Sequence, residues 1–521
     1  MPETVGLPAQ AAALAALVAL PIALFGPPAG DLPAHLYRTF LVEQGVLVWD
    51  EHWYGGHYPL FSYSLLYYFP AALVGNEVLA VVSVVAAAAF FASVIEREWG
   101  ARTAALRWPA YAFAVAAAGP LFTGTFPYAA GLAAALASLR AFQAGRIWLA
   151  LAAAAVAVGM SPLAFLFLAL ALIAVVLARR LFSRRLVVPA VGISVLGLVP
   201  GAAVLLFPYE ATYPFFQTIE LLIVIALAAL GAYLAAREPR GWPLALFLLL
   251  WSLIALVAFL VPSPVGENIT RLRGAIFPLI LLAAVLARFR PLWLAVPAVA
   301  GALAYNLVPW LAQIPRVDTS PAHESFWRPA LDFLGEHHEA GFRVEVVPTA
   351  GHWEAYWLPR EGFPIARGWY RQLDYAQNRL FYEKPLRPEP YRAWLREQGV
   401  RYVLVPDAQL GRMGEEREAE LVLSGRSGLR QVTVAGPIAI YEVPRAASIL
   451  PRGTITLLDH GRIEGRVPSA GSYALHVRWT PHRGVEHGAI SLERAADGTT
   501  RLVARGPGPF ILRIGFELRP P

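Results

Sequence analysis

Long apolar blocks limit what the first part of this chain can fold into. Up to about Leu311 the sequence is a series of apolar stretches separated by short segments rich in Arg, Gly and Pro. A helix needs roughly 20 apolar residues to cross a bilayer, fewer where the membrane is locally thin. The backbone must be helical there, because lipid cannot satisfy its polar groups. The length rule predicts about eleven spans. These are Leu7–Phe25, Val78–Ile95, Ala104–Gly119, Pro127–Leu139, Trp148–Gly159, Leu163–Leu177, Leu186–Phe207, Phe216–Ala236, Leu244–Val261, Ala275–Leu286 and Leu292–Leu311.

Composition supports a membrane protein and excludes several other classes. The chain is 57% hydrophobic and 15% charged, whereas soluble domains contain about 25% charged residues. Cysteine is absent, which excludes disulfides, thiolate metal sites and cysteine nucleophiles. No Walker loop, zinc motif or Ser-His-Asp spacing appears, so an ATP-driven pump or a protease has no support.

The distribution of arginine predicts the topology. Most of the net charge of +7 lies in short loops between apolar blocks, as expected for a cytoplasmic face rather than for a nucleic-acid-binding surface. This pattern results if the polar segment Gly30–Pro59 lies outside and the aromatic stretch Leu60–Gly75 is re-entrant or interfacial. The chain is then a multi-pass protein of the plasma membrane, with its C-terminal domains extracytoplasmic.

The polar segment Gly30–Pro59 opens with three ionisable residues at helical spacing. Asp31, His35 and Arg38 are separated by four and three residues, which places them on one face of a helix. An anion, an imidazole and a cation together predict an acid/base and phosphate-binding surface, with Asp31 and His35 as the catalytic candidates and Arg38 as a substrate contact. The alternatives are an N-cap at Asp31 and an ion pair along the helix.

The second half of this segment combines adjacent acids with aromatic residues. Asp50 and Glu51, together with Asp31, are candidate ligands for Mg²⁺ or Mn²⁺, which prefer oxygen ligands; a solvated turn is the alternative. Trp53, Tyr54 and His57 are candidate contacts for a sugar ring or a prenyl chain. Aromatic residues at this depth also form interfacial belts.

Two further arginines lie on the predicted outer side. Arg271 and Arg273 occur at the entrance to a span, against the charge bias of the other loops. The guanidinium fork matches phosphate oxygens, so both are predicted to bind substrate phosphate. The alternatives are snorkelling to lipid headgroups and pairing with Glu267.

The membrane half resembles a known superfamily. The resemblance rests on a first span followed by Asp31, with His35 and Arg38 one and two turns on, and then on the run VWDEHWYGGHYPLFSYSLLYYFPAALVG. This pattern resembles the GT-C polytopic glycosyltransferases. More narrowly, it resembles bacterial membrane proteins labelled as related to 6-pyruvoyl-tetrahydropterin synthase. Some GT-C members have an adjacent acidic pair at the position of Asp31, and this chain does not.

The resemblance implies a reaction. In GT-C enzymes the first outer loop carries the essential acid, here Asp31, and Asp50 or Glu51 would match a second acidic position. The donor is a polyprenyl-phosphate-linked sugar, and the acceptor would be an extracytoplasmic glycan or lipid. The alternative is a transporter or flippase for lipid-linked glycans, or a scaffold. A transporter would place ionisable residues within its spans, where Glu220 is one of few here.

The region after Pro315 has the pattern of a soluble protein. Helices are predicted at Trp327–His338, Tyr391–Gln398 and Glu415–Ser424, and strands at Phe342–Val347, Val400–Pro406 and Ile438–Val443. This alternation indicates a small α/β domain, in which Trp369, Arg371, Asp374 and Asn378 could bind a sugar or pack against a neighbour. Short alternating runs after about Ser448 predict a β-sandwich. The expected domains are 1–315 (membrane, with its catalytic loop at 30–59), 316–446 (α/β) and 447–521 (β-sandwich).

Overall fold

The computed structural model divides the chain into two compact units. It describes residues 6–56, 58–59, 63–100, 104–179, 187–207, 213–215, 217–313, 318–383, 385–411 and 414–516. The first unit comprises Met1–Gly30, Tyr63–Leu206 and Thr212–Arg316. The second comprises Asp31–Ser62, Phe207–Ala211 and Val317–Pro521. The polar segment that follows the first apolar block therefore belongs to the same unit as the C-terminal region.

The first unit is helical. Its α-helices are α1 (Leu7–Phe25), α3 (Tyr68–Val74), α4 (Asn76–Trp99), α5 (Arg107–Ala116), α6 (Pro120–Thr123), α7 (Phe126–Gln143), α8 (Ile147–Met160), α9 (Pro162–Arg179), α10 (Val187–Leu206), α11 (Thr218–Ala236), α12 (Trp242–Leu260), α13 (Arg273–Leu286) and α14 (Leu292–Gln313). Short 3-10 helices, Pro239–Gly241 and Gly266–Leu272, precede α12 and α13. The segment expected to be re-entrant contains α3, which is seven residues long and too short to cross a bilayer.

Within the described residues, seven helices are long and apolar enough to cross a membrane. They are Leu7–Phe25, Asn76–Trp99, Pro162–Arg179, Val187–Leu206, Thr218–Ala236, Pro239–Leu260 and Gly266–Leu286. The shorter apolar helices are Ile147–Met160 and Leu292–Leu307. These helices indicate a membrane protein. The structure does not confirm the larger span number, because the segment expected to span from Ala104 to Gly119 is divided between a 3-10 turn and the 10-residue α5.

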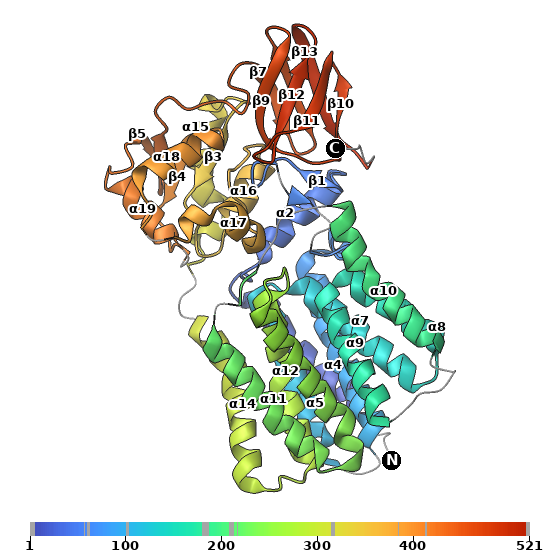
Figure 1. Ribbon diagram of the computed structural model, residues 1–521. Helices are drawn as coiled ribbons and strands as arrows, with labels where there is room; N and C mark the ends of the chain where they lie inside the picture. Colours follow the sequence, from blue (N-terminus) through green and yellow to red (C-terminus); the bar gives the residue numbers. More distant parts are fainter. Residues whose placement is uncertain are drawn as a thin grey trace. The chain divides into compact units, whose positions relative to one another are not determined.

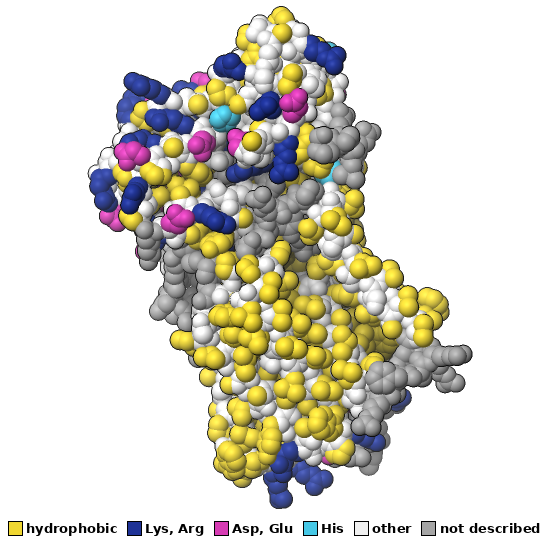
Figure 2. Space-filling model, in the orientation of Figure 1, with side chains coloured by type: hydrophobic (Ala, Val, Ile, Leu, Met, Phe, Trp, Pro, Cys, Tyr) yellow, Lys and Arg dark blue, Asp and Glu magenta, His cyan; other side chains and the backbone are white. Residues whose placement is uncertain are grey.

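Small residues allow these helices to pack closely. Ala11, Ala15 and Ala19 form the buried face of α1, and their spacing of four residues aligns them on one side of the helix. A Cβ at Gly131 of α7 would lie 2.7 Å from the Cβ of Ser161. Small residues at such positions are typical of helix contacts in membranes. The lipid-facing side is apolar: Leu198 and Leu205 of α10 are 70% and 83% exposed, and Figure 2 shows hydrophobic side chains over the visible face of this unit.

The second unit contains a four-stranded mixed sheet with helices around it (Figure 1). Its order is β3 (Arg343–Val346), β4 (Val400–Pro406), β6 (Ile438–Glu442), β5 (Arg430–Ala435), with β3 and β4 parallel. The helices are α15 (Glu324–His337), α16 (Glu354–Arg360), α17 (Arg371–Gln377), α18 (Pro388–Glu397) and α19 (Glu415–Leu423). Each helix and strand predicted in this region is present within a few residues of its expected bounds. The strand β5 and the short helices α16 and α17 were not predicted.

The C-terminal region consists of strands in two further sheets. One has the order β10 (Arg483–His487), β13 (Gly508–Ile514), β8 (Arg462–Val467), β7 (Thr454–Asp459), and the other β11 (Ile490–Arg494), β12 (Thr499–Ala504), β9 (Gly471–Arg478). All pairings are antiparallel. Both sheets contribute to one apolar core, with Phe510 and Leu512 from the first and Leu475 and Leu502 from the second.

The segment after Asp31 completes this unit. It forms α2 (Leu32–Glu43) and a minimal hairpin of β1 (Trp49–Asp50) and β2 (Tyr58–Pro59). The helix packs against α16 of the α/β region. The backbone N–H of Glu51 donates to the carbonyl of His460, which lies in the turn between β7 and β8. The segment is therefore part of the interior of the second unit.

Candidate functional site

The helix α2 carries the first group of predicted site residues. Asp31 is the residue before its first turn and is half-buried, whereas His35 and Arg38 are each 2% exposed. Among the described residues, the Asp31 side chain accepts no capping hydrogen bond from the first turn of the helix. The Arg38 guanidinium donates to the Pro59 carbonyl at 3.5 Å. Of these three residues, only Asp31 is not fully buried.

The turn after β1 depends on residues with positive φ. Tyr54, Gly55 and Gly56 have φ of 55°, 67° and 74°. A Cβ at Gly56 would lie 2.1 Å from a carboxylate oxygen of Glu51, so this position requires glycine. Trp49 Nε1 donates to the Gly56 carbonyl at 2.7 Å. The glycine pair thus allows the turn to close over Glu51.

The aromatic residues of this segment are packed inside the second unit. Trp53 stacks on Tyr37 with ring centroids 4.7 Å apart, and its Nε1 donates to the Ala355 carbonyl at 3.1 Å. The Tyr54 hydroxyl accepts a hydrogen bond of 2.6 Å from the backbone N–H of Tyr370. Both side chains are almost fully buried. Their role in this structure is to attach the segment to the α/β region. His57, a third predicted substrate contact, lies outside the described residues.

Glu51 forms a buried ion pair with Arg483 of β10. The Arg483 Nε and Nη2 atoms donate to the two carboxylate oxygens at 2.9 and 2.7 Å, and both side chains are 1% exposed. Arg483 also donates to the Arg478 carbonyl and the Thr500 hydroxyl. Burial raises the pKa of Glu51, and the charge of Arg483 opposes this. The buried Arg343 contributes a second positive charge, and burial lowers its pKa to about 10.

Asp50, beside Glu51, belongs to a separate cluster with two histidines. Its carboxylate accepts hydrogen bonds from the Tyr37 hydroxyl at 2.9 Å and from the backbone N–H of His52 at 3.1 Å. His460 Nδ1 lies 3.0 Å from Asp50 Oδ1. The His52 and His460 rings have centroids 3.9 Å apart. Burial, reinforced by His460, lowers the pKa of His52 to about 4.

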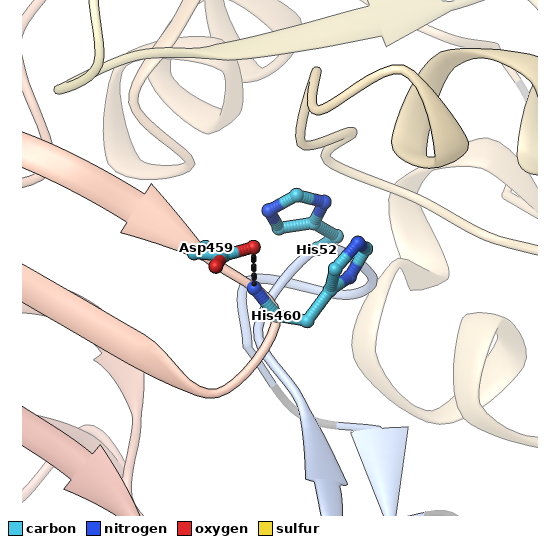
Figure 3. Close-up of side chains that lie close together, drawn as sticks. All are labelled: His52, Asp459 and His460. Atoms are coloured by element: carbon cyan, nitrogen blue, oxygen red, sulfur yellow. Dashed lines mark hydrogen bonds between the residues drawn. The ribbon is translucent and has the colours of Figure 1, made fainter. Parts of the chain in front are cut away.

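Asp459 completes a group of possible metal ligands with these histidines (Figure 3). His52, Asp459 and His460 each offer one ligand atom, and these atoms lie within 4.8 Å of one another. The carboxylate of Asp459 is exposed and accepts from the backbone N–H of His460 at 2.8 Å. Sequence reasoning missed this group because His52 and His460 are far apart in the chain and fit no motif of fixed spacing.

A third buried cluster occupies the α/β region. Arg367 Nε and Nη2 bind the Asp374 carboxylate at 3.0 and 2.9 Å, which also accepts from Asn378 and Tyr382. Burial raises the pKa of Glu418, 3.2 Å from Arg367 Nη1, to about 7. Asp374 and Asn378, considered as sugar-binding groups from the sequence, are therefore structural members of this network.

Arg271 and Arg273, the two arginines predicted to bind phosphate, lie in the first unit. Arg273 pairs with Glu220 at 3.3 Å, rather than with Glu267 as considered from the sequence, and Tyr305 donates to the same carboxylate at 2.7 Å. Arg271 is half-buried and donates to the Tyr63 hydroxyl at 2.8 Å. A small apolar pocket reaches the start of α13. It is lined by Val84, Ala87, Phe113, Ala116, Ala117, Pro120, Tyr128, Ala129, Leu132, Gly274 and Ala275.

The predicted site residues are thus divided between the two units. Asp31, His35, Arg38, Asp50, Glu51, Trp53 and Tyr54 belong to the second unit, and Arg271 and Arg273 to the first. Within the second unit, the acids at Asp50 and Glu51 lie in two different networks rather than around one shared point. No family model matches the chain, and no curated protein matches it.

Proposed function

We propose that this chain is an integral membrane glycosyltransferase that moves a sugar from a polyprenyl-phosphate donor to an extracytoplasmic glycan or lipid acceptor. The proposal includes about eleven spans under the length rule, a location in the plasma membrane and a second unit on the outer side. It also treats the two C-terminal sheets as a β-sandwich, since both line one apolar core.

The position of Asp31 carries the proposal. It is the first residue of the second unit and directly follows the part of the chain that contains the first candidate span. Asp31 is half-buried, and the helix that it precedes is fixed by the buried side chains of His35, Tyr37 and Arg38. A general base has to be held in place and still be reached by substrate. Asp31 meets both requirements, whereas His35 is buried.

The proposed reaction is a single displacement with inversion. The Asp31 carboxylate takes the proton of an acceptor hydroxyl as the hydroxyl oxygen bonds to the anomeric carbon of the donor sugar. The bond from that carbon to the phosphate oxygen breaks, and its electron pair leaves with the polyprenyl phosphate. The charge that develops on the phosphate requires a cation, the role that the sequence predicts for Arg38, Arg271 and Arg273.

No step of this reaction passes through a metal at Asp50 or Glu51. A cation at Glu51 would have to replace the Arg483 fork, which already binds both carboxylate oxygens. At Asp50 it would have to displace Tyr37 and His460. The donor sets of these two acids therefore do not fit Mg²⁺ or Mn²⁺, which need several free oxygen ligands.

The test is transfer by the full-length protein in proteoliposomes. Polyprenyl-phosphate-linked hexoses and pentoses serve as labelled donors, with extracted envelope glycans and lipids as acceptors. Asp31→Asn is expected to reduce transfer at least about a hundredfold, the usual contribution of a general base. Asp332→Asn is the control, because Asp332 is an exposed carboxylate of the same unit.

Two results would refute the assignment. Transfer by Asp31→Asn at the parental rate would remove Asp31 as the base. If the wild-type protein transferred none of the sugars but moved labelled lipid between leaflets, the alternative of a flippase would replace the transferase. Absence of both activities would leave the scaffold alternative.

A further inference from the structure

We propose that His52, Asp459 and His460 bind a divalent transition-metal ion that joins the Trp49–Gly56 segment to the turn between β7 and β8. The three residues lie within the second unit, and their ligand atoms are within 4.8 Å of one another (Figure 3). Two imidazole nitrogens and a carboxylate oxygen form a donor set that suits Zn²⁺ and Co²⁺. None of the three residues takes part in the proposed glycosyl transfer.

The surroundings of His460 set up one nitrogen for coordination. Its Nδ1 lies 3.0 Å from Asp50 Oδ1, and the Tyr37 hydroxyl donates to the other oxygen of the same carboxylate. A carboxylate that accepts the Nδ1 proton leaves the lone pair on Nε2. Metal-binding histidines almost always have such a partner, because it fixes the tautomer and the ring orientation.

The surroundings of His52 leave one of its ring nitrogens without a hydrogen to donate. Its Nδ1 lies 3.3 Å from the Pro359 carbonyl oxygen, and its Nε2 lies 3.2 Å from the Leu458 carbonyl oxygen. A neutral imidazole has one N–H and can donate to only one of these acceptors. The other nitrogen then directs its lone pair at a carbonyl oxygen. Neighbouring ligands of one metal, bound at about 2.1 Å, lie roughly 3.0–3.4 Å apart, so a metal ion would resolve this conflict.

Asp459 supplies the third ligand and the route of entry. It is the last residue of β7, its side chain is exposed, and its carboxylate already accepts from the His460 backbone. The buried histidines hold their positions, while the exposed carboxylate can rotate toward the ion. The hydrogen bond from Glu51 N–H to the His460 carbonyl fixes the two segments in register before any ion binds.

The experiment measures metal binding by the full-length protein in detergent after chelator treatment and desalting. ZnCl₂, CoCl₂ and MgCl₂ are added separately, and bound metal is counted by mass spectrometry after gel filtration. We expect one Zn²⁺ or Co²⁺ per chain and no retained Mg²⁺, and Co²⁺ should show the visible spectrum of nitrogen and oxygen ligation. Metal should also slow hydrogen exchange in the peptide that contains Glu51.

Two variants and a control decide the assignment. Asp459→Asn removes an exposed ligand without disturbing the interior and should weaken Zn²⁺ binding at least about tenfold. His460→Ala should abolish it. His476→Ala is the control, because this histidine lies in the same region with its Nδ1 at the Glu397 carbonyl. Wild-type protein that retains no Zn²⁺ or Co²⁺, or Asp459→Asn protein that binds as tightly as wild type, would overturn the proposal.

Discussion

Replacing Glu51 with glutamine should release the Trp49–Gly56 segment from the second unit. The substitution keeps the size of the side chain but removes the charge of a side chain that is 1% exposed and is bound by Nε and Nη2 of Arg483. Arg483 and the neighbouring Arg343 would then be two buried cations without this carboxylate. Removing one partner of a buried pair costs about 3–5 kcal/mol.

Hydrogen–deuterium exchange reports this loss without requiring reversible unfolding of a membrane protein. The reporter is the Glu51 amide, which donates to the His460 carbonyl at 2.9 Å. Each 1.4 kcal/mol is a factor of ten in the opening equilibrium, so exchange of this peptide in Glu51→Gln should accelerate about a hundred- to several-thousand-fold.

The matched control is Glu493→Gln. Glu493 pairs with Arg501 at 4.0 Å on the surface of the neighbouring sheet, with side chains 57% and 49% exposed. Exposed pairs contribute about 1 kcal/mol or less, so exchange near Glu493 should change by less than about tenfold. The double variant Glu51→Gln/Arg483→Met should recover at least about 1 kcal/mol relative to the sum of the single losses. Equal exchange in Glu51→Gln and Glu493→Gln would refute the reasoning.

Two further predictions concern the same unit. Gly56→Ala should lower the free energy of unfolding by several kcal/mol more than Gly45→Ala. Both glycines have φ near 74°, but an added Cβ meets the Glu51 carboxylate at Gly56 and open space at Gly45. Differential scanning fluorimetry of the two variants measures the difference. Burial raises the pKa of Glu418 from 4.5 to about 7, so the folded chain retains a proton that the unfolded chain releases between these values. The free energy of unfolding should therefore fall as pH rises through this window, by up to about 1.4 kcal/mol per pH unit. Glu418→Gln should flatten this dependence and the exposed Glu420→Gln should not; unchanged slopes in both would contradict it.

The regular elements of the second unit could be predicted because their signals are local. The strand Val400–Pro406 has the predicted bounds, since a buried run between turn residues needs no knowledge of its neighbours. The strand β5, Arg430–Ala435, was missed because its side chains are mostly exposed and its identity comes from pairing with β6. The helices of the first unit followed from hydropathy, but α5 shows that apolar composition alone does not determine helix length.

The interior of the second unit could not be predicted from spacing. The polar segment was singled out from its composition, yet the partner of Glu51 is 432 residues away and the sequence contains no sign of this pairing. Trp53 and Tyr54 illustrate the same limit. From composition they fit a substrate platform or an interfacial belt, whereas the structure buries both against the α/β region. Residue type identified a segment rich in ionisable and aromatic side chains. Only the tertiary contacts show which group each of these side chains binds.

The density of buried charge in this segment has a consequence for Asp31. Hydrophobic side chains of similar volume would usually stabilise such an interior as well or better. Unlike hydrophobic side chains, charged and hydrogen-bonding groups need particular partners. Glu51 needs the guanidinium of Arg483, and Asp50 needs Tyr37 and His460. These contacts define one position for the hairpin, and Tyr37 extends that constraint into α2. A base at the start of α2 would thereby be held in a fixed orientation before substrate arrives, which is the condition under which a single carboxylate is effective.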